Sequence, residues 1–171
     1  MSYGVQLMGG LFNAIIPHNH PSKTQYGFST VKDRQTAALI KIYQGERTLC
    51  KDNHYLGEFV VKGLPAKYCE QVTLHVTMSI DLNGILHVSA TEDTTGVSKS
   101  IEIENENRVL TEYQKNDFIE KAAKMKLEDE AIAETIEARN KLQLFAFDLR
   151  RRMTMKNRNL WIVKNIVMKR E

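Results

Sequence analysis

The chain has 171 residues, of which 42% are hydrophobic and 26% are charged. This composition is typical of a folded globular protein and excludes a wholly disordered chain, and a net charge of +3 is too small to indicate nucleic-acid binding by itself. Cys50 and Cys69 are too few for a disulfide scaffold and lack the paired spacing of a zinc site, so no metal site is expected.

The two halves of the chain differ in their content of glycine and proline. All nine glycines lie at or before Gly96, and all three prolines lie at or before Pro65. Because these residues punctuate turns and are costly inside helices, the first half is expected to form strands and the second half long helices. We therefore predict two domains, over residues 1–105 and 106–171.

Short strands are predicted throughout the first domain. Residues 4–8 and 11–16 flank the Gly9-Gly10 turn, and residues 37–44 and 55–61 add two more strands. Over residues 72–80, apolar and polar side chains alternate, which indicates a strand with one buried face. The Asn83-Gly84 turn leads into residues 85–90, and another turn leads into residues 98–103. This regular spacing predicts an antiparallel, two-layer β-sandwich.

Helical signals begin at Thr111. Gln114 follows it by three residues, which is the capping-box pattern, so a helix should begin at Glu112. Apolar residues continue at helical spacing as far as Leu149. Residues 104–149 contain eleven acidic residues, whereas eight bases and one acid follow from Arg150 onward. The fold class expected for the whole chain is thus a β-sandwich followed by an α-helical segment.

Five segments in fixed order resemble the seventy-kilodalton heat-shock chaperones. They are residues 4–10 (GVQLMGG), 28–30 (FST), 43–47 (YQGER), 56–59 (LGEF) and 80–90 (IDLNGILHVSA). The resemblance implies a peptide-binding sandwich followed by part of a helical lid. It also implies that the ATPase domain of the family lies upstream, so the chain is expected to be no enzyme and to hold no cofactor, with ATP bound by that upstream domain.

The resemblance further implies where an extended client peptide would bind. Such a peptide brings unpaired backbone groups and needs an apolar pocket for its side chains. Backbone partners are expected from Gln6, Leu7, Ser29 and Val31. The expected pocket residues are Val5, Phe28, Ala38, Ile40 and Leu74. Met8 and Val31 are expected to arch over the client, and Asp33 and Phe147 are expected to take part in contacts between the loops and the lid.

Partners and compartment are also implied by the resemblance. The expected partners are unfolded or extended hydrophobic peptides, J-domain co-chaperones and nucleotide exchange factors acting on the full protein, and another copy of the chain through the lid helices. Residues 51–54 (KDNH) favour the endoplasmic reticulum lumen, with the cytoplasm as the alternative. An alternative function is an interaction module in which the basic segment 150–171 drives oligomerisation or binds a membrane surface or nucleic acid.

Overall fold

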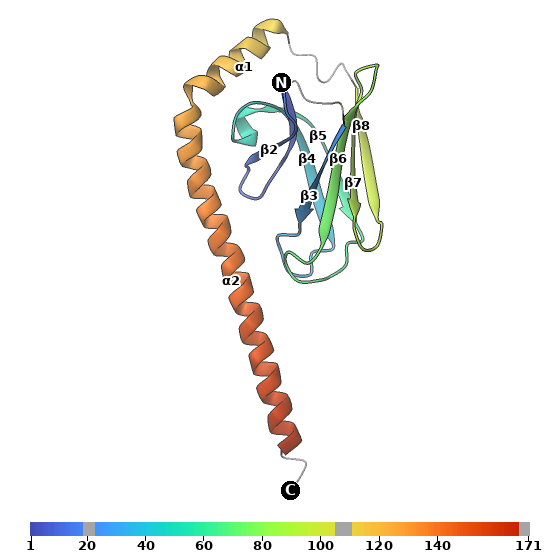
Figure 1. Cartoon of the computed structure of the whole chain (residues 1–171), viewed down its shortest axis with the longest axis vertical. Coiled ribbons are helices and arrows are strands. Elements are labelled where there is room, and N and C mark those ends of the chain that lie inside the picture. The colour runs from blue at the N-terminus through green and yellow to red at the C-terminus, as the bar shows by residue number, and fades with distance from the viewer. Residues whose placement is uncertain (19–22, 105–110, 168–171) are drawn as a thin grey trace. The chain divides into compact units, whose positions relative to one another are not determined.

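The computed structural model describes residues 1–18, 23–104 and 111–167 (Figure 1). The chain divides into two compact units, Met1–Glu137 and Ala138–Glu171. The described elements, in chain order, are β1 (Ser2–Gln6), β2 (Phe12–Ile16), β3 (Lys23–Ser29), β4 (Ala37–Gly45), the 3-10 helix η1 (Cys50–Asp52), β5 (His54–Lys62), β6 (Thr73–Ile80), β7 (Leu86–Glu92), β8 (Ser98–Ile103), α1 (Glu112–Lys124) and α2 (Lys126–Val167).

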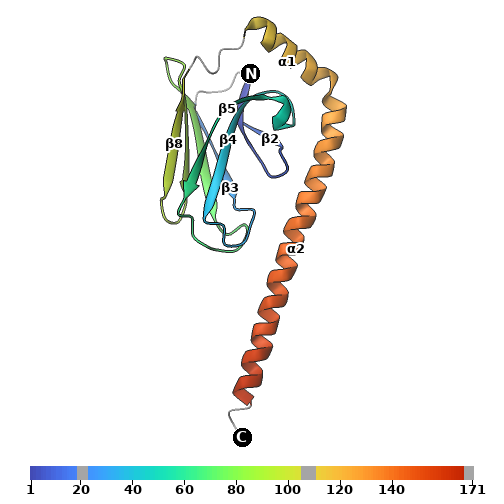
Figure 2. The ribbon, with the colours of Figure 1, turned by 180° about the vertical axis from the view of Figure 1, so that it is seen from behind.

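The strands form two four-stranded sheets, in the orders β2-β1-β4-β5 and β3-β6-β7-β8. Each pair of neighbouring strands in the described part of the chain is antiparallel. The reverse view in Figure 2 shows β4 and β5 side by side, with β8 at the edge of the other sheet. The expected strands are therefore found, with ends that differ by one or two residues.

The sheets share one hydrophobic core. Ile15 and Ile42 come from the first sheet, and Val76, Met78 and Val88 come from the second, and all five are fully buried. The alternating pattern of β6 explains this arrangement, because successive side chains of a strand point to opposite faces. The buried side chains of β6 are Leu74, Val76 and Met78, as the alternation predicted.

The predicted start of the first helix is confirmed. The Thr111 hydroxyl accepts a hydrogen bond from the Gln114 backbone N–H (3.2 Å), and the Gln114 side chain accepts one from the Thr111 backbone N–H (2.9 Å). α1 ends at Lys124, and α2 then runs over 42 residues that contain neither glycine nor proline. Among the described residues, no helix has the length and apolar character needed to cross a bilayer.

The expected fold class, a β-sandwich followed by a helical lid, needs correction. The described chain has two four-stranded antiparallel sheets followed by two helices, and the first compact unit extends through α1 and the first turns of α2 to Glu137. These turns are not a separate lid, because Ala133 of α2 is buried in a cluster with Leu11 and Leu49. The predicted domain boundary between residues 105 and 106 lies outside the described residues.

Candidate functional site

The five predicted pocket residues come from four strands and meet at one hydrophobic cluster. Val5 of β1, Ala38 of β4 and Leu74 of β6 are buried within the cluster, each with at most 7% of its surface exposed. Phe28 of β3 and Ile40 of β4 are half-buried and pack against it. The first three therefore form part of the core, and Phe28 and Ile40 supply apolar surface that a ligand could reach.

The end of β1 and the turn that follows it contain three of the predicted site residues. The Leu7 backbone N–H donates to the Leu11 carbonyl (2.8 Å), and the Leu7 carbonyl accepts from the Gly10 N–H (3.1 Å). Met8 is half-buried, and Gln6 is exposed. The Leu7 side chain packs against the cluster that contains Leu11, and binding of a client by the Leu7 backbone stays a prediction.

The end of β3 and the loop that follows it contain the other predicted backbone partners. Ser29 is the last residue of β3 and lies opposite Thr73 of β6. Since β3 is an edge strand of its sheet, one side of its backbone faces away from β6. Val31 is half-buried, and its backbone N–H donates to the Gln35 side chain (3.3 Å). Backbone binding by these residues stays a prediction.

The Asp33 carboxylate connects two loops of the first unit. It accepts a hydrogen bond from the Cys69 backbone N–H (2.9 Å), and the neighbouring Arg34 backbone N–H donates to the Lys67 carbonyl (2.7 Å). Asp33 therefore helps to hold the loop after β3 against the loop before β6. Phe147 is half-buried on α2 in the second unit, so its predicted role in a lid contact stays a prediction.

A buried ion pair, which the sequence did not indicate, joins the sheets to α2. Arg47 Nε and Nη2 donate to the two carboxylate oxygens of Asp129 at 2.6 and 2.7 Å. Only 7% of Arg47 and 2% of Asp129 are exposed. The hydrogen bonds from Arg47 are the main cause that lowers the pKa of Asp129, and those to Asp129 are the main cause that raises the pKa of Arg47. This two-bonded geometry fixes the position of the first turns of α2.

The loop that carries Arg47 is itself held by a buried amide. The Asn53 side-chain oxygen accepts from the Arg47 backbone N–H (3.0 Å), and the Asn53 side-chain nitrogen donates to the Arg47 and Leu49 carbonyls (2.7 and 3.2 Å). Gly45 leaves room for this amide, because a Cβ atom there would lie 2.0 Å from the Asn53 oxygen. The Arg47 backbone is therefore held by contacts that do not involve α2.

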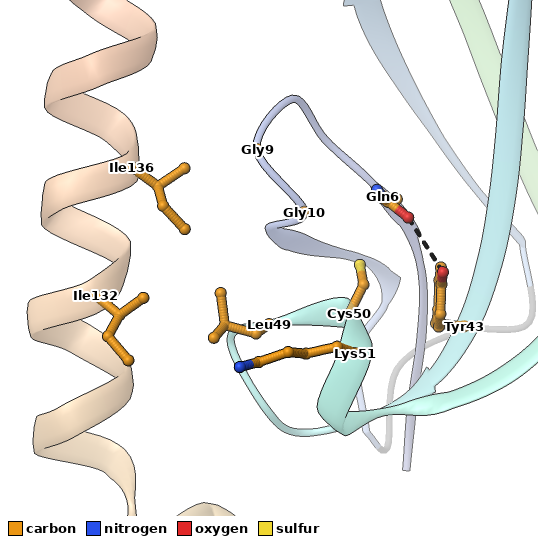
Figure 3. Close-up of a pocket in the computed structure, with 9 residues that line it drawn as sticks. All are labelled: Gln6, Gly9, Gly10, Tyr43, Leu49, Cys50, Lys51, Ile132 and Ile136. Carbon is orange, nitrogen blue, oxygen red and sulfur yellow. Dashed lines mark hydrogen bonds between the residues drawn. The ribbon is translucent and has the colours of Figure 1, made fainter.

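Beside the ion pair, α2 borders a pocket of about 370 Å³ (Figure 3). Its other walls are the Gly9-Gly10 turn, Tyr43 and η1. Figure 3 shows Ile132 and Ile136 pointing from α2 toward Leu49. The pocket thus combines apolar walls with the ammonium group of Lys51.

Cys50 also lines this pocket but does not have the character of a reactive thiol. Its side chain is buried, it donates to the Leu11 carbonyl (3.4 Å), and burial raises its pKa to about 12. The thiol is therefore protonated at neutral pH, and a protonated thiol is a poor nucleophile.

A second buried carboxylate, Glu92, serves the turn between β7 and β8. It accepts from both the backbone N–H and the hydroxyl of Thr95 (2.5 Å each), and these bonds bring its pKa down to about 2. The buried Glu92 carboxylate therefore has a structural role in this turn.

Comparison with known proteins gives a family for nearly the whole chain. The model of the family described as "Hsp70 protein" matches residues 1–166. This match runs through both sheets and both helices, so the strands and the helical part belong to the same family region.

Curated relatives agree with the family match. A protein named "Heat shock 70 kDa protein" from Neurospora crassa is 38% identical over 152 residues, which cover 88% of this chain and 24% of that protein. A protein of the same name from Penicillium citrinum is 37% identical over 156 residues, which cover 90% of this chain and 31% of that protein. The chain therefore spans about a quarter to a third of the length of these relatives.

The match corrects two expectations, namely that the chain is no enzyme and that it holds no cofactor. Both expectations set the chain apart from the ATP-hydrolysing activity that characterises the family. The Hsp70 family model matches residues 1–166, which is nearly the whole chain, so both expectations are withdrawn. By the family match and by its relatives, this chain belongs to the Hsp70 family of chaperones.

Proposed function

We propose that this chain contributes to chaperone function by binding short, extended apolar segments of unfolded proteins at the pocket residues of its first unit. The observation that carries the proposal is the meeting of Val5, Phe28, Ala38, Ile40 and Leu74 at one hydrophobic cluster, although they come from four strands. Phe28 and Ile40, half-buried at its margin, would contact an apolar side chain of the client.

The surroundings of this margin fit an extended ligand. Ser29 ends an edge strand, whose outer side can offer backbone groups to a client strand. Met8 and Val31 are half-buried in the turns that follow β1 and β3, so both would offer apolar surface to a client. The Asp33 contact with Cys69 would hold the loop after β3 in position while a ligand binds.

The expected affinity is moderate. Burial of one leucine-sized side chain contributes about 1.5 to 3 kcal/mol, and each net hydrogen bond about 0.5 to 1.5 kcal/mol. Ordering of the peptide offsets part of this gain, which leaves a dissociation constant of roughly micromolar magnitude. Such binding tolerates many client sequences, as a chaperone requires.

The activities of the whole protein are part of the same proposal. We propose that ATP binding and hydrolysis control the lifetime of the bound client, and that J-domain co-chaperones and nucleotide exchange factors act on that cycle. We also propose the endoplasmic reticulum lumen as the compartment. The support for these proposals is the family membership, and for the compartment it is the sequence KDNH at residues 51–54.

The test is a fluorescence-anisotropy titration of the full chain with a labelled peptide that carries a central leucine between basic residues. Ile40→Ser should weaken binding at least roughly tenfold, because a polar group would replace apolar contact surface. Leu39→Ser is the matched control: Leu39 is the adjacent residue of β4, points to the opposite face and is exposed, so its replacement should leave the affinity unchanged.

Thermal unfolding of both variants would show that each is folded. Absence of saturable binding in the parent chain would refute the proposal. Equal affinities of the two folded variants would likewise show that the client does not bind at this margin.

A further inference from the structure

The second unit carries an apolar stripe along α2, which we call the α2 stripe. It consists of Ala138, Leu142, Phe145 and Leu149, which follow one another in steps of four, three and four residues. All four are exposed, Leu142 and Phe145 by 68% and 58%. Alternating steps of three and four are the spacing of a helix seam that packs against another helix.

The α2 stripe lies on the face of the helix opposite to the one that is used within the first unit. Asp129, Ala133 and Ile136 make contacts of α2 in that unit, and their spacing of four and three residues puts them on one face of the helix. Leu142 lies six residues after Ile136, which at 100° per residue turns it by about 240°, and Ala138 is turned by about 200°. The stripe is therefore distinct from the docking face of α2.

We propose that the α2 stripe pairs with the α2 stripe of a second copy of this chain, with the two helices antiparallel. A helix seam needs a complementary helix seam, and a second copy supplies one of the same length and spacing. The charges along α2 favour the antiparallel direction over the parallel one.

In a parallel pair, like charges would meet. Arg152 lies three residues after Leu149 and so continues the seam, where it would face Arg152 of the second copy. Arg150 and Arg151 of both copies would gather at the same end. Asp148 pairs with Arg151 and Arg152 of its own helix (2.6 Å each), which leaves a net charge of +2 from three arginines and one aspartate. A parallel pair would therefore be disfavoured.

In an antiparallel pair, opposite charges would meet. If Leu142 lies opposite Phe145 of the second copy, Ala138 lies opposite Leu149, and residues 150–152 lie alongside residues 135–137 of the other copy. Glu134 and Glu137 are exposed in that part of α2. The antiparallel register therefore buries the α2 stripe and brings the basic end of each helix beside acidic residues of the other.

The first test is sedimentation velocity of the full chain over roughly 1 to 200 µM, the range in which a short seam should dissociate. The parent chain should convert from monomer to dimer, and Leu142→Glu should weaken the dimer at least tenfold. The matched control is Gln143→Glu, which adds the same negative charge: Gln143 is exposed on α2 but is turned by about 100° from Leu142 and lies outside the stripe, so its replacement should leave the dimer unchanged.

The second test determines direction by disulfide cross-linking. A mixture of Ala138→Cys and Leu149→Cys chains should form cross-linked dimers between unlike copies, whereas Leu149→Cys alone should not. Cys50 and Cys69 are buried, so they should contribute little background.

Three results would overturn the proposal: a monomeric parent chain at all concentrations, equal effects of Leu142→Glu and Gln143→Glu, or efficient cross-linking of Leu149→Cys chains alone. Binding of a monomeric parent to anionic vesicles that Leu142→Glu abolishes would assign the stripe to a lipid surface instead. Peptide binding at Ile40 is measured separately, so failure here leaves the proposed function to its own test.

Discussion

At the scale of single residues, Arg47 and Asp129 form the contact whose loss should affect stability most. Both side chains are almost completely buried, and two short hydrogen bonds join them. A buried charge that loses its partner retains its desolvation cost without the compensating attraction. By contrast, the exposed pair of Lys126 and Glu130 is separated by 3.9 Å on the surface of α2, where water screens the attraction.

We expect Asp129→Asn to lower the free energy of unfolding by about 3 kcal/mol, because it leaves the buried Arg47 guanidinium with only the more distant Asp52 carboxylate, at 3.7 Å, as an ion-pair partner. Glu130→Gln, the neighbouring control, should change it by less than about 0.5 kcal/mol. Urea unfolding followed by circular dichroism would measure both. A cost as small as that of the control would show that the Arg47–Asp129 pair contributes no net stability.

The same pair predicts a dependence on pH. The folded state lowers the pKa of Asp129 below its ordinary value of 3.8, so the folded chain binds this proton more weakly than the unfolded chain does. The stabilisation is complete above the ordinary value and is lost as pH falls through the lowered pKa. Asp129→Asn should remove this part of the acid sensitivity, so the stability difference between parent and variant should narrow below about pH 4.

At the scale of elements, the pairing of β1 with β2 depends on a close approach at Gly4. A Cβ atom at this position would lie 2.1 Å from the Asn13 carbonyl oxygen and 2.8 Å from a ring carbon of Phe12. The first of these neighbours is backbone and can yield only if β2 shifts. Gly57 of β5 has more room, since its added Cβ would meet side-chain methyl groups at 3.7 and 3.8 Å.

Gly4→Ala should therefore destabilise the chain by about 2 kcal/mol or more, through displacement of β2 from β1. Gly57→Ala, the matched control, should change stability by less than about 1 kcal/mol. Thermal unfolding would give the stability, and amide hydrogen exchange would show whether lost protection is confined to β1 and β2. Similar effects of the two substitutions would contradict the close approach.

How well an element could be predicted depended on how strongly its side chains alternate. β6 and β7 were predicted within two residues at each end because one face of each strand is regularly apolar and Asn83-Gly84 marks the turn. β3 was not predicted from its pattern, since only Thr24 and Phe28 are half-buried and its other residues are exposed. β3 is held as a strand by its antiparallel pairing with β6, which its own sequence does not indicate.

At the scale of the whole molecule, the family resemblance indicated the pocket residues but not the contact that holds α2. The five pocket residues could be named because they match positions of the family, even Phe28, which lies in the unpredicted strand β3. Arg47 and Asp129 are 82 residues apart, and Asp129 lies in an acidic run that is typical of a solvated helix face. Only the folded arrangement shows that this one carboxylate is buried. The sequence likewise did not indicate that the first turns of α2 pack against the sheets, so the helical lid was predicted as a separate element.

The last prediction follows from the extent of the first compact unit, Met1–Glu137. A chain that ends at Glu137 keeps Asp129 and Ala133, so its free energy of unfolding should stay within about 1 kcal/mol of the parent value. A chain that ends at Lys124 loses both residues and should be less stable by about 3 kcal/mol or more, because Arg47 loses the Asp129 carboxylate and Leu11 and Leu49 lose their apolar cover. Urea unfolding would compare the three chains. Equal stability of the two shortened chains would show that the first turns of α2 do not belong energetically to the sheets, whereas loss of stability in both would move the boundary of the cooperative unit beyond Glu137.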